Sequence, residues 1–361
     1  MPLTLVAYSD ARGRGGAEHS LGHLLAHLPD DVRVHVVGPD PVVTGWLGSR
    51  RPGARTHVVA GLGPTARLLH RLRPDVVHLN RCTPWACQAG TAAALTLPGA
   101  RVTTVDQLPL RSVDLPTVLR TRALTRRVDA AVAVGEASAR RVEDFYALGR
   151  GSVRSIPNYV PDPGPPRRRR RSGPLRLVSV GRLDRVKGHD VLLRALADVP
   201  HAELVLLGEG GTRVALEKQV AELGLADRVR MPGWQEDVPR LLPRYDALVL
   251  PSRTEGWPLT VVEAMLAGLP VVATPVGSVA EAVADGDSGL LVPSDDPAAL
   301  AAALRRLTDE PGLAERLGAR GRQVAAAGMT APRMAERWLA LWDELQAGPR
   351  TARLVPPAPR P

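Results

Sequence analysis

The chain has 361 residues, of which 44% are hydrophobic, and a formal net charge of +10. This length favours two domains, and no apolar run reaches the ~18 residues of a membrane span. The first eight residues are too short for a secretory apolar segment and lack basic flanks. Two cysteines form neither a disulfide framework nor a metal pattern. These features predict a cytoplasmic protein.

Arginine supplies most of the positive charge, because Lys187 and Lys218 are the only lysines among 47 basic residues. With 34 glycines and 34 prolines, this composition indicates GC-rich coding, so much of the charge is compositional. Basic and aromatic residues do not interleave as stacking on bases requires, and nucleic-acid binding is therefore not expected. Phosphorylated ligands and anionic membranes remain compatible with the charge.

Apolar strand-like runs alternate with helical stretches along the first 160 residues. The predicted strands are residues 3–8, 32–37, 56–60, 75–79, 101–105 and 130–134, with helices that include 65–72 and 140–148. This alternation predicts a parallel sheet with both faces covered, and ligands of such sheets bind beyond the carboxyl ends of the strands. Residues directly after strands are thus candidate cleft residues, or equally caps and loop residues: Arg81, Asp106, Gln107 and Glu136.

The first loop, residues 9–18, is rich in glycine, which lets backbone N–H groups approach a phosphate closely. A dinucleotide fingerprint needs a further glycine where Glu18 stands, which argues against a nicotinamide dehydrogenase. An ordinary strand-to-helix turn is the alternative. In the following helix, His19, His23 and His27 share one face, which is predicted to be a solvated polar face rather than a metal site.

A proline-rich linker is predicted at residues 161–166, followed by an arginine run at 167–171 that is either solvated or docks on an anionic membrane. Alternation then resumes. The predicted strands are 175–180, 203–207, 229–234, 247–250, 269–273 and 289–292, and the helices are 297–307, 314–324 and 334–345. The tail, residues 348–361, is predicted to be disordered.

Residues 252–268 predict a loop and a helix after the strand at 247–250, with Glu255 and Gly256 at the helix entrance. Free N–H groups at such an entrance form an anion site that fits a diphosphate. Glu263 lies about two turns deeper if both carboxylates are helical. The two carboxylates could bind separate hydroxyls of one elongated ligand. Alternatively, Glu255 is an ordinary helix-start acid and Glu263 a solvated surface residue.

The spacing Glu255, seven residues, Glu263, between residues 250–252 and 267–273, resembles the signature of the GT4 retaining glycosyltransferases. The resemblance is specific over residues 175–307 and weaker over 3–160. It implies the GT-B fold, with two Rossmann-like parallel-sheet domains facing across a cleft. Residues 1–165 would form the acceptor-side domain, 172–330 the nucleotide-sugar domain, and 331–347 a helix that crosses back to the first domain.

The same resemblance implies roles for individual residues. Glu255 would face the donor sugar, Arg182 and Lys187 would grip the diphosphate, and Glu263 would bind the ribose hydroxyls. Trp234 stacks on the base or belongs to the core. The residues implied to bind the donor are Gly15, Gly16, Arg182, Lys187, Met231, Gly256, Leu259, Thr260 and Glu263.

The chain departs from the family near residues 104–109, where the family often has a histidine and this sequence has none. Asp106 or Gln107 would then have to contact the sugar or the acceptor. Asp106 is therefore a candidate catalytic residue, together with Glu255, Arg182 and Lys187.

The expected activity is retaining transfer of a hexosyl unit from a UDP- or GDP-sugar to an unknown acceptor, without metal or other cofactor. The implied place is the cytoplasm, with the inner face of the membrane as an open alternative. The rival functions are a nucleotide-sugar epimerase of the same fold, a nicotinamide dehydrogenase and a basic module that binds anionic polymers.

Overall fold

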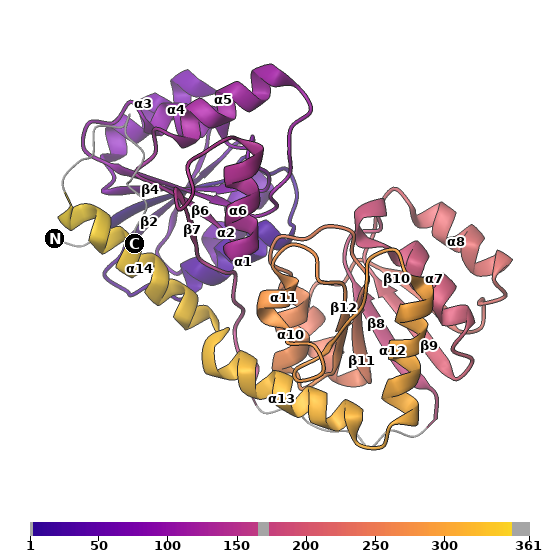
Figure 1. Cartoon of the computed structure of the whole chain (residues 1–361). Helices are drawn as coiled ribbons and strands as arrows, with labels where there is room; N and C mark the ends of the chain where they lie inside the picture. Colours follow the sequence, from indigo (N-terminus) through magenta and orange to yellow (C-terminus); the bar gives the residue numbers. More distant parts are fainter. Residues whose placement is uncertain (1–2, 165–172, 349–361) are drawn as a thin grey trace. The chain divides into compact units, whose positions relative to one another are not determined.

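The computed structural model describes residues 3–164 and 173–348, and the chain divides into two compact units. The first unit comprises Met1–Pro161 and Ala331–Pro361, and the second comprises Asp162–Thr330 (Figure 1). The chain therefore leaves the first unit just before the proline-rich stretch and returns to it with its last helix. The arginine run at 167–171 and the tail from residue 349 lie outside the described residues.

The first unit contains a parallel sheet with the strand order β3-β2-β1-β4-β5-β6-β7. Strands β4 and β5 are buried along their whole length, because both faces of the sheet are covered. Their sequences, VVHLNR and RVTTVD, therefore place polar and charged side chains inside the unit. The six predicted strands are present, and the three-residue strand β7 was not predicted because it is short and contains Arg154. The strands are β1 (Thr4–Tyr8), β2 (Arg33–Gly38), β3 (Arg55–Val58), β4 (Val76–Arg81), β5 (Arg101–Asp106), β6 (Ala130–Ala133) and β7 (Val153–Ser155).

Helices cover this sheet. They are α1 (Gly16–Ala26), α2 (Pro41–Ser49), α3 (Leu62–Leu72), α4 (Gln88–Ala94), α5 (Leu115–Thr125), α6 (Glu136–Phe145) and α14 (Ala331–Ala347). The last helix, α14, packs against α1. Its Trp342 is fully buried, with its ring centroid 5.8 Å from that of His78 on β4.

The predicted solvated histidine face of α1 is wrong at His23. This side chain is only 8% exposed, and burial lowers the pKa of its imidazole to about 4. Residues distant in the sequence lie against α1: Ser20 donates a hydrogen bond of 2.5 Å to Asn158 Oδ1, and its hydroxyl lies 3.9 Å from Met334 Sδ of α14. The polar pattern of the helix alone could not predict that distant segments bury this part of α1.

The second unit has a parallel sheet with the order β10-β9-β8-β11-β12-β13. Its strands are β8 (Leu175–Val180), β9 (Ala202–Leu207), β10 (Val229–Gly233), β11 (Ala247–Leu250), β12 (Val271–Ala273) and β13 (Leu290–Leu291). Its helices are α7 (His189–Ala197), α8 (Arg213–Glu222), α9 (Val238–Leu241), α10 (Leu259–Leu266), α11 (Val279–Ala282), α12 (Pro297–Asp309) and α13 (Leu313–Gly328), with 3-10 turns η1 (Arg185–Lys187) and η2 (Leu242–Arg244). The core between these layers is almost entirely Leu, Val and Ala.

Each sheet has a point where the strand order reverses, between β1 and β4 in the first unit and between β8 and β11 in the second. The connections diverge there, and a crevice opens beyond the carboxyl ends of the two strands. The topology therefore brings residues 181–188 and 251–258 together in the second unit. In the first unit it brings together residues 9–15 and 82–87. Among the described helices, none is both long and apolar enough to cross a membrane.

Candidate functional site

A lysine and a glutamate meet where β8 and β11 end. Lys187 Nζ donates a hydrogen bond of 2.6 Å to Glu255 Oε1, and Ser252 Oγ donates one of the same length to that oxygen. The Glu255 residue is 5% exposed and the Lys187 side chain is 20% exposed. Two residues 68 positions apart in the sequence therefore form one charged pair in the described structure.

Two glycines permit the backbone approach that makes this pair. Gly188 has a φ of +66°, and a Cβ atom there would lie 2.0 Å from the Pro251 carbonyl oxygen. Gly277 has a φ of +59°, and its Cβ would lie 2.0 Å from the Glu255 carbonyl oxygen. Because both positions need a left-handed backbone and have no room for a side chain, larger residues are excluded. The backbone thus fixes the loop that carries Glu255 from two sides.

Helix α10 begins at Leu259, so Glu255 and Gly256 precede the helix rather than lie in its first turn. Pro258 occupies the N-cap position, and no side chain caps the helix. Leu259 and Thr260 are the first two helical residues, whose N–H groups have no partner within a helix. An uncapped helix start in the same loop region as a partly exposed lysine suits an anion.

Glu263 is half-buried on α10, which contradicts the alternative that it is a solvated surface acid. Burial, with a smaller contribution from Asp237, raises the pKa of its carboxyl to about 7. Near neutral pH the group therefore exchanges between its protonated and ionised forms. A ligand whose hydroxyls donate hydrogen bonds to this group favours the ionised form.

Arg182 and Met231, which were expected to lie at the donor, contact other protein residues in the structure. The Arg182 side chain is 72% exposed and its Nη2 lies 2.9 Å from Asp184 Oδ2. The backbone oxygen of Met231 accepts a hydrogen bond of 2.8 Å from Arg213. Trp234, three residues further along, is 45% exposed, so it does not belong to the core.

The first loop of the first unit is closed by Glu18. The Gly15 N–H donates to Glu18 Oε2 at 3.1 Å, and Ser9 Oγ donates to Glu18 Oε1 at 3.4 Å. Burial raises the pKa of the Glu18 carboxyl. The Gly15 N–H is thus already used within the loop, whereas Gly16 is exposed and has no atom within 4 Å of the position of a Cβ.

The proposed sugar contact of Asp106 requires correction. Asp106 is fully buried, and Arg81 Nη2, itself in a 2% exposed residue, donates to its Oδ2 at 2.6 Å. Burial raises the pKa of Asp106, while the charge and hydrogen bond of Arg81 oppose this change. A carboxylate enclosed in this way cannot reach a sugar in this conformation.

The neighbouring Gln107 is also occupied. It donates to Asn80 Oδ1 at 2.8 Å and accepts from Asn158 Nδ2 at 2.5 Å. Both candidates for the place of the family histidine therefore take part in internal polar contacts.

Several residues of the site were not identified from the sequence. Ser252 and Arg253 belong to the same motif as Glu255, and Asp190 follows Gly188 by two positions. In the first unit, Asp10 accepts hydrogen bonds from the Cys87 N–H at 2.7 Å and from its Sγ at 3.3 Å. Proximity to a motif was the only available signal for these residues, because their partners lie far away in the sequence. Over residues 3–164 and 173–348, no group of three or more His, Cys, Asp or Glu is arranged to hold a metal ion.

Two family models match the chain. Residues 165–324 match "Glycosyl transferases group 1", and residues 14–162 match "Glycosyltransferase Family 4". The two matches together run from the first loop of the first unit to helix α13.

Curated relatives are similar over part of their length. The lipopolysaccharide core biosynthesis glycosyltransferase LpsD of Rhizobium meliloti is 35% identical over 167 residues, which are 46% of this chain and 49% of the relative. The D-inositol 3-phosphate glycosyltransferase of Streptomyces avermitilis is 41% identical over 153 residues, 38% of this chain and 33% of that protein. The chain thus spans half or less of the length of these relatives.

Solved structures resemble the whole chain. HepE of Anabaena, solved in complex with UDP, has a TM-score of 0.82 at 20% identity, covering 95% of this chain and 100% of that chain. Sucrose-phosphate synthase of Thermosynechococcus elongatus has a TM-score of 0.78 at 21% identity, covering 96% and 99%. These likenesses confirm the predicted fold class with two Rossmann-like parallel-sheet domains.

Substitution of Glu263 tests the environment of its carboxyl. A carboxyl whose pKa is higher in the folded chain than in the unfolded chain loses stabilising free energy as pH rises through the folded value of about 7. Glu263→Gln should therefore unfold at a higher temperature than the wild type at pH 8, and the two should converge near pH 5. At about 1.4 kcal/mol for each pH unit between the two pKa values, the difference in free energy of unfolding reaches up to about 3 kcal/mol.

Thermal unfolding followed by circular dichroism at several pH values measures this difference. The matched control is Glu222→Gln on α8, whose side chain is 60% exposed and should give a small difference throughout. A Glu263→Gln curve that stays parallel to the wild type from pH 5 to pH 8 would contradict the raised pKa.

Proposed function

We propose that the protein transfers a hexosyl unit from a nucleotide diphosphate sugar to an acceptor hydroxyl with retention of anomeric configuration. The proposal follows from membership of the GT4-type glycosyltransferases of the GT-B fold. The observation that carries this proposal is the contact of Lys187 with Glu255 beside the uncapped start of α10. Solved relatives of the same fold include HepE in complex with UDP-glucose. UDP and GDP sugars are the proposed donors.

The diphosphate is assigned to Lys187, Arg182 and the N–H groups of Leu259 and Thr260. A compact ammonium and a planar guanidinium neutralise phosphate oxygens in complementary ways. Negative charge grows on the leaving diphosphate as the bond to the anomeric carbon breaks, so groups that stabilise this charge lower the barrier. Arg182 is exposed and held by Asp184, and it would exchange this partner for the phosphate.

Glu263 is assigned to the ribose, whose hydroxyls would donate to its ionised carboxyl. Glu255 is assigned to the transferred sugar: its Oε1 is occupied by Lys187 and Ser252, which leaves Oε2 for a sugar hydroxyl. Retention on one face would let the departing phosphate oxygen accept the proton of the acceptor hydroxyl, so no protein side chain is assigned as a base. With cations and helix N–H groups on the diphosphate, no divalent ion is required.

The acceptor class stays broad: a glycolipid, a polysaccharide precursor or a secondary metabolite. The names of the relatives above give no support to the epimerase alternative. An epimerase would also turn over the donor without any acceptor.

Mass spectrometry of products from a panel of nucleotide sugars, with and without candidate acceptors, tests the proposed reaction. We expect acceptor-dependent transfer that persists in excess chelator, and NMR of the product should show the anomeric configuration of the donor. Acceptor-independent conversion of one nucleotide sugar into another would favour the epimerase. Loss of transfer in chelator, restored by magnesium, would contradict the metal-independent mechanism.

Removal of either proposed phosphate cation should slow the reaction strongly. Lys187→Ala and Arg182→Ala are each expected to lower kcat by about 10²–10³, the range for one lost contact to developing charge. The matched control is Lys218→Ala, which removes the other lysine of the chain from an exposed position on α8. Steady-state kinetics of the three variants measures the effect, and wild-type kcat in Lys187→Ala would remove its assignment to the diphosphate.

We also propose peripheral contact with an anionic membrane, supported by the surface of helices α3, α4 and α5, which lie next to one another (Figure 1). Residues 61–73 and 115–127 contain no Asp or Glu, whereas their arginines are mostly exposed. Leu62 on α3 and Leu115 and Leu119 on α5 are at least half exposed, as is Val113 just before α5. We call this surface the basic face. Cationic side chains around apolar ones suit an anionic lipid surface, at about 1 kcal/mol for each arginine near it.

Co-sedimentation with vesicles tests the basic face. The protein should bind phosphatidylglycerol-containing vesicles, release at high salt, and bind pure phosphatidylcholine weakly. Leu115→Ser combined with Leu119→Ser should reduce binding, whereas Val214→Ser, on exposed α8 of the second unit, should not. Equal sedimentation with both lipids, or a double variant that binds as the wild type does, would contradict this partner.

A further inference from the structure

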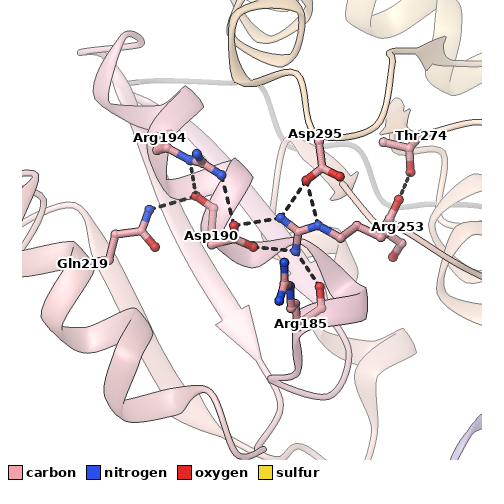
Figure 2. Close-up of polar contacts among 8 residues, drawn as sticks. Arg185, Asp190, Arg194, Gln219, Arg253, Thr274 and Asp295 are labelled. Atoms are coloured by element: carbon pink, nitrogen blue, oxygen red, sulfur yellow. Dashed lines mark hydrogen bonds and ion pairs between the residues drawn. The ribbon is translucent and has the colours of Figure 1, made fainter.

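Arg253 lies two residues before Glu255, and its side chain joins three segments of the second unit (Figure 2). Its Nη1 and Nη2 atoms each donate at 2.8 Å to a different oxygen of Asp190 on α7. Its Nε donates at 2.7 Å to Asp295 Oδ1, in the loop after β13. Nη1 also donates at 2.5 Å to the carbonyl oxygen of Arg185. All three nitrogens of the guanidinium are therefore engaged.

The backbone of Arg253 holds the same turn as its side chain. Its N–H donates at 2.7 Å to the carbonyl oxygen of Val186. The two carbonyls that Arg253 binds, those of Arg185 and Val186, directly precede Lys187 in turn η1. The residue after Lys187 is Gly188, which packs against the Pro251 carbonyl at a distance that excludes a side chain. Arg253 thus binds the loop of residues 251–258 to the turn that carries Lys187.

The far side of the same loop is also fixed. Ser252, whose hydroxyl donates to Glu255, accepts a hydrogen bond of 2.5 Å at its carbonyl oxygen from Thr274 Oγ1. Glu255 is thereby anchored through Ser252 to Thr274, directly after β12, while Lys187 is anchored through Arg253 to α7. The separation between Lys187 and Glu255 follows from these two anchors.

The charges around Arg253 are well matched. Burial alone would raise the pKa of Asp190, but the hydrogen bonds and charge of Arg253 lower it overall. Asp190 also accepts a hydrogen bond of 3.0 Å from Arg194 Nη2. The Asp190 carboxylate is therefore ionised at neutral pH, opposite the guanidinium of Arg253.

We propose that Arg253 is a positioning residue for the transfer reaction, because it fixes the Lys187 turn relative to Glu255 without itself touching the donor. This inference rests on the proposed function. A lysine cannot replace Arg253, because one ammonium cannot reach Asp190, Asp295 and the Arg185 carbonyl in a single plane. The expected loss lies in kcat, because misplacement of the Lys187 ammonium weakens the stabilisation of the leaving diphosphate.

The same unit offers a matched control. Arg176 binds Asp246 through Nε at 3.1 Å and Nη2 at 2.9 Å, a two-point contact of the same kind. It joins the amino end of β8 to the start of β11, whereas Arg253 lies beyond the carboxyl ends of these strands. If such contacts only stabilise the unit, substitution of either arginine should have similar consequences.

Kinetics of Arg253→Lys, Arg253→Gln and Arg176→Gln separates the two roles. We expect kcat to fall about 10- to 100-fold in both Arg253 variants, with the dissociation constant of UDP within about threefold of wild type by calorimetry. Arg176→Gln should keep wild-type kcat per folded molecule. In the Lys187→Ala background, Arg253→Gln should have little further effect on kcat, because the group that it positions is absent.

A second measurement needs no activity. Lys187 and Lys218 are the only lysines, so limited acetylation followed by peptide mass spectrometry reports the reactivity of one relative to the other. Lys187 is 20% exposed and paired, whereas Lys218 is 77% exposed, so the wild type should label mainly at Lys218. Arg253→Gln should raise relative labelling of Lys187 several-fold, and Arg176→Gln should leave it unchanged.

The outcomes are distinguishable. If the wild type transfers from no nucleotide sugar, the proposed function fails, and the labelling ratio still decides whether Arg253 positions Lys187. An unchanged labelling ratio in Arg253→Gln overturns the inference, as does a kcat loss that is just as large in the Lys187→Ala background. If Arg253→Gln does not fold, Asp295→Ala removes the contacts of this one carboxylate with Nε and Nη2, and it should raise labelling of Lys187 to a smaller extent.

Discussion

The contact between Lys187 and Glu255 depends on a single topological constraint, the reversal of strand order between β8 and β11. Because these neighbouring strands are parallel, the loops that follow them lie at the same edge of the sheet, and the divergence of the chain there leaves a crevice between them. Gly188 and Gly277 then allow backbone contact that no larger residue could make. The result is a lysine whose charge is balanced by a carboxylate in the absence of ligand. Under the proposed function, a diphosphate competes with Glu255 for this ammonium.

The two units use equivalent edges of their sheets differently. In the second unit the polar groups at the reversal point include a partly exposed lysine and the open start of a helix. In the first unit Glu18 closes its own loop, and Arg81 encloses Asp106. The buried ion pair of Arg81 with Asp106 is costly to break, since removal of one partner would leave an uncompensated charge. The first unit therefore provides a fixed polar framework, and acceptor contacts under the proposed function must come from residues other than Asp106.

Arginine has three separate roles in this protein, although its abundance is explained by GC-rich coding. Arg81 neutralises a carboxylate inside the first unit, and Arg253 connects segments around the candidate site. The arginines of the basic face instead point into solvent without acidic neighbours on the same helices. Net charge alone could not separate these roles, since burial and partners decide them. The planar guanidinium explains why one residue type serves both as a buried connector and as a surface cation.

The sequence by itself determined the alternation of strands and helices, the positions of twelve of the thirteen strands found in the described residues, and the motif residues around Glu255. These features are local, because periodicity, glycine and proline act within a few residues of where they stand. Tertiary structure alone decided that Lys187 binds Glu255, that Asp106 is enclosed, that His23 of α1 is buried, and that Glu263 titrates near neutral pH. Each of these properties depends on burial or on a partner from a distant segment. Burial and a distant partner cannot be predicted from a residue and its neighbours in the chain. The dielectric environment and the opposing charge are set only when the sheets assemble.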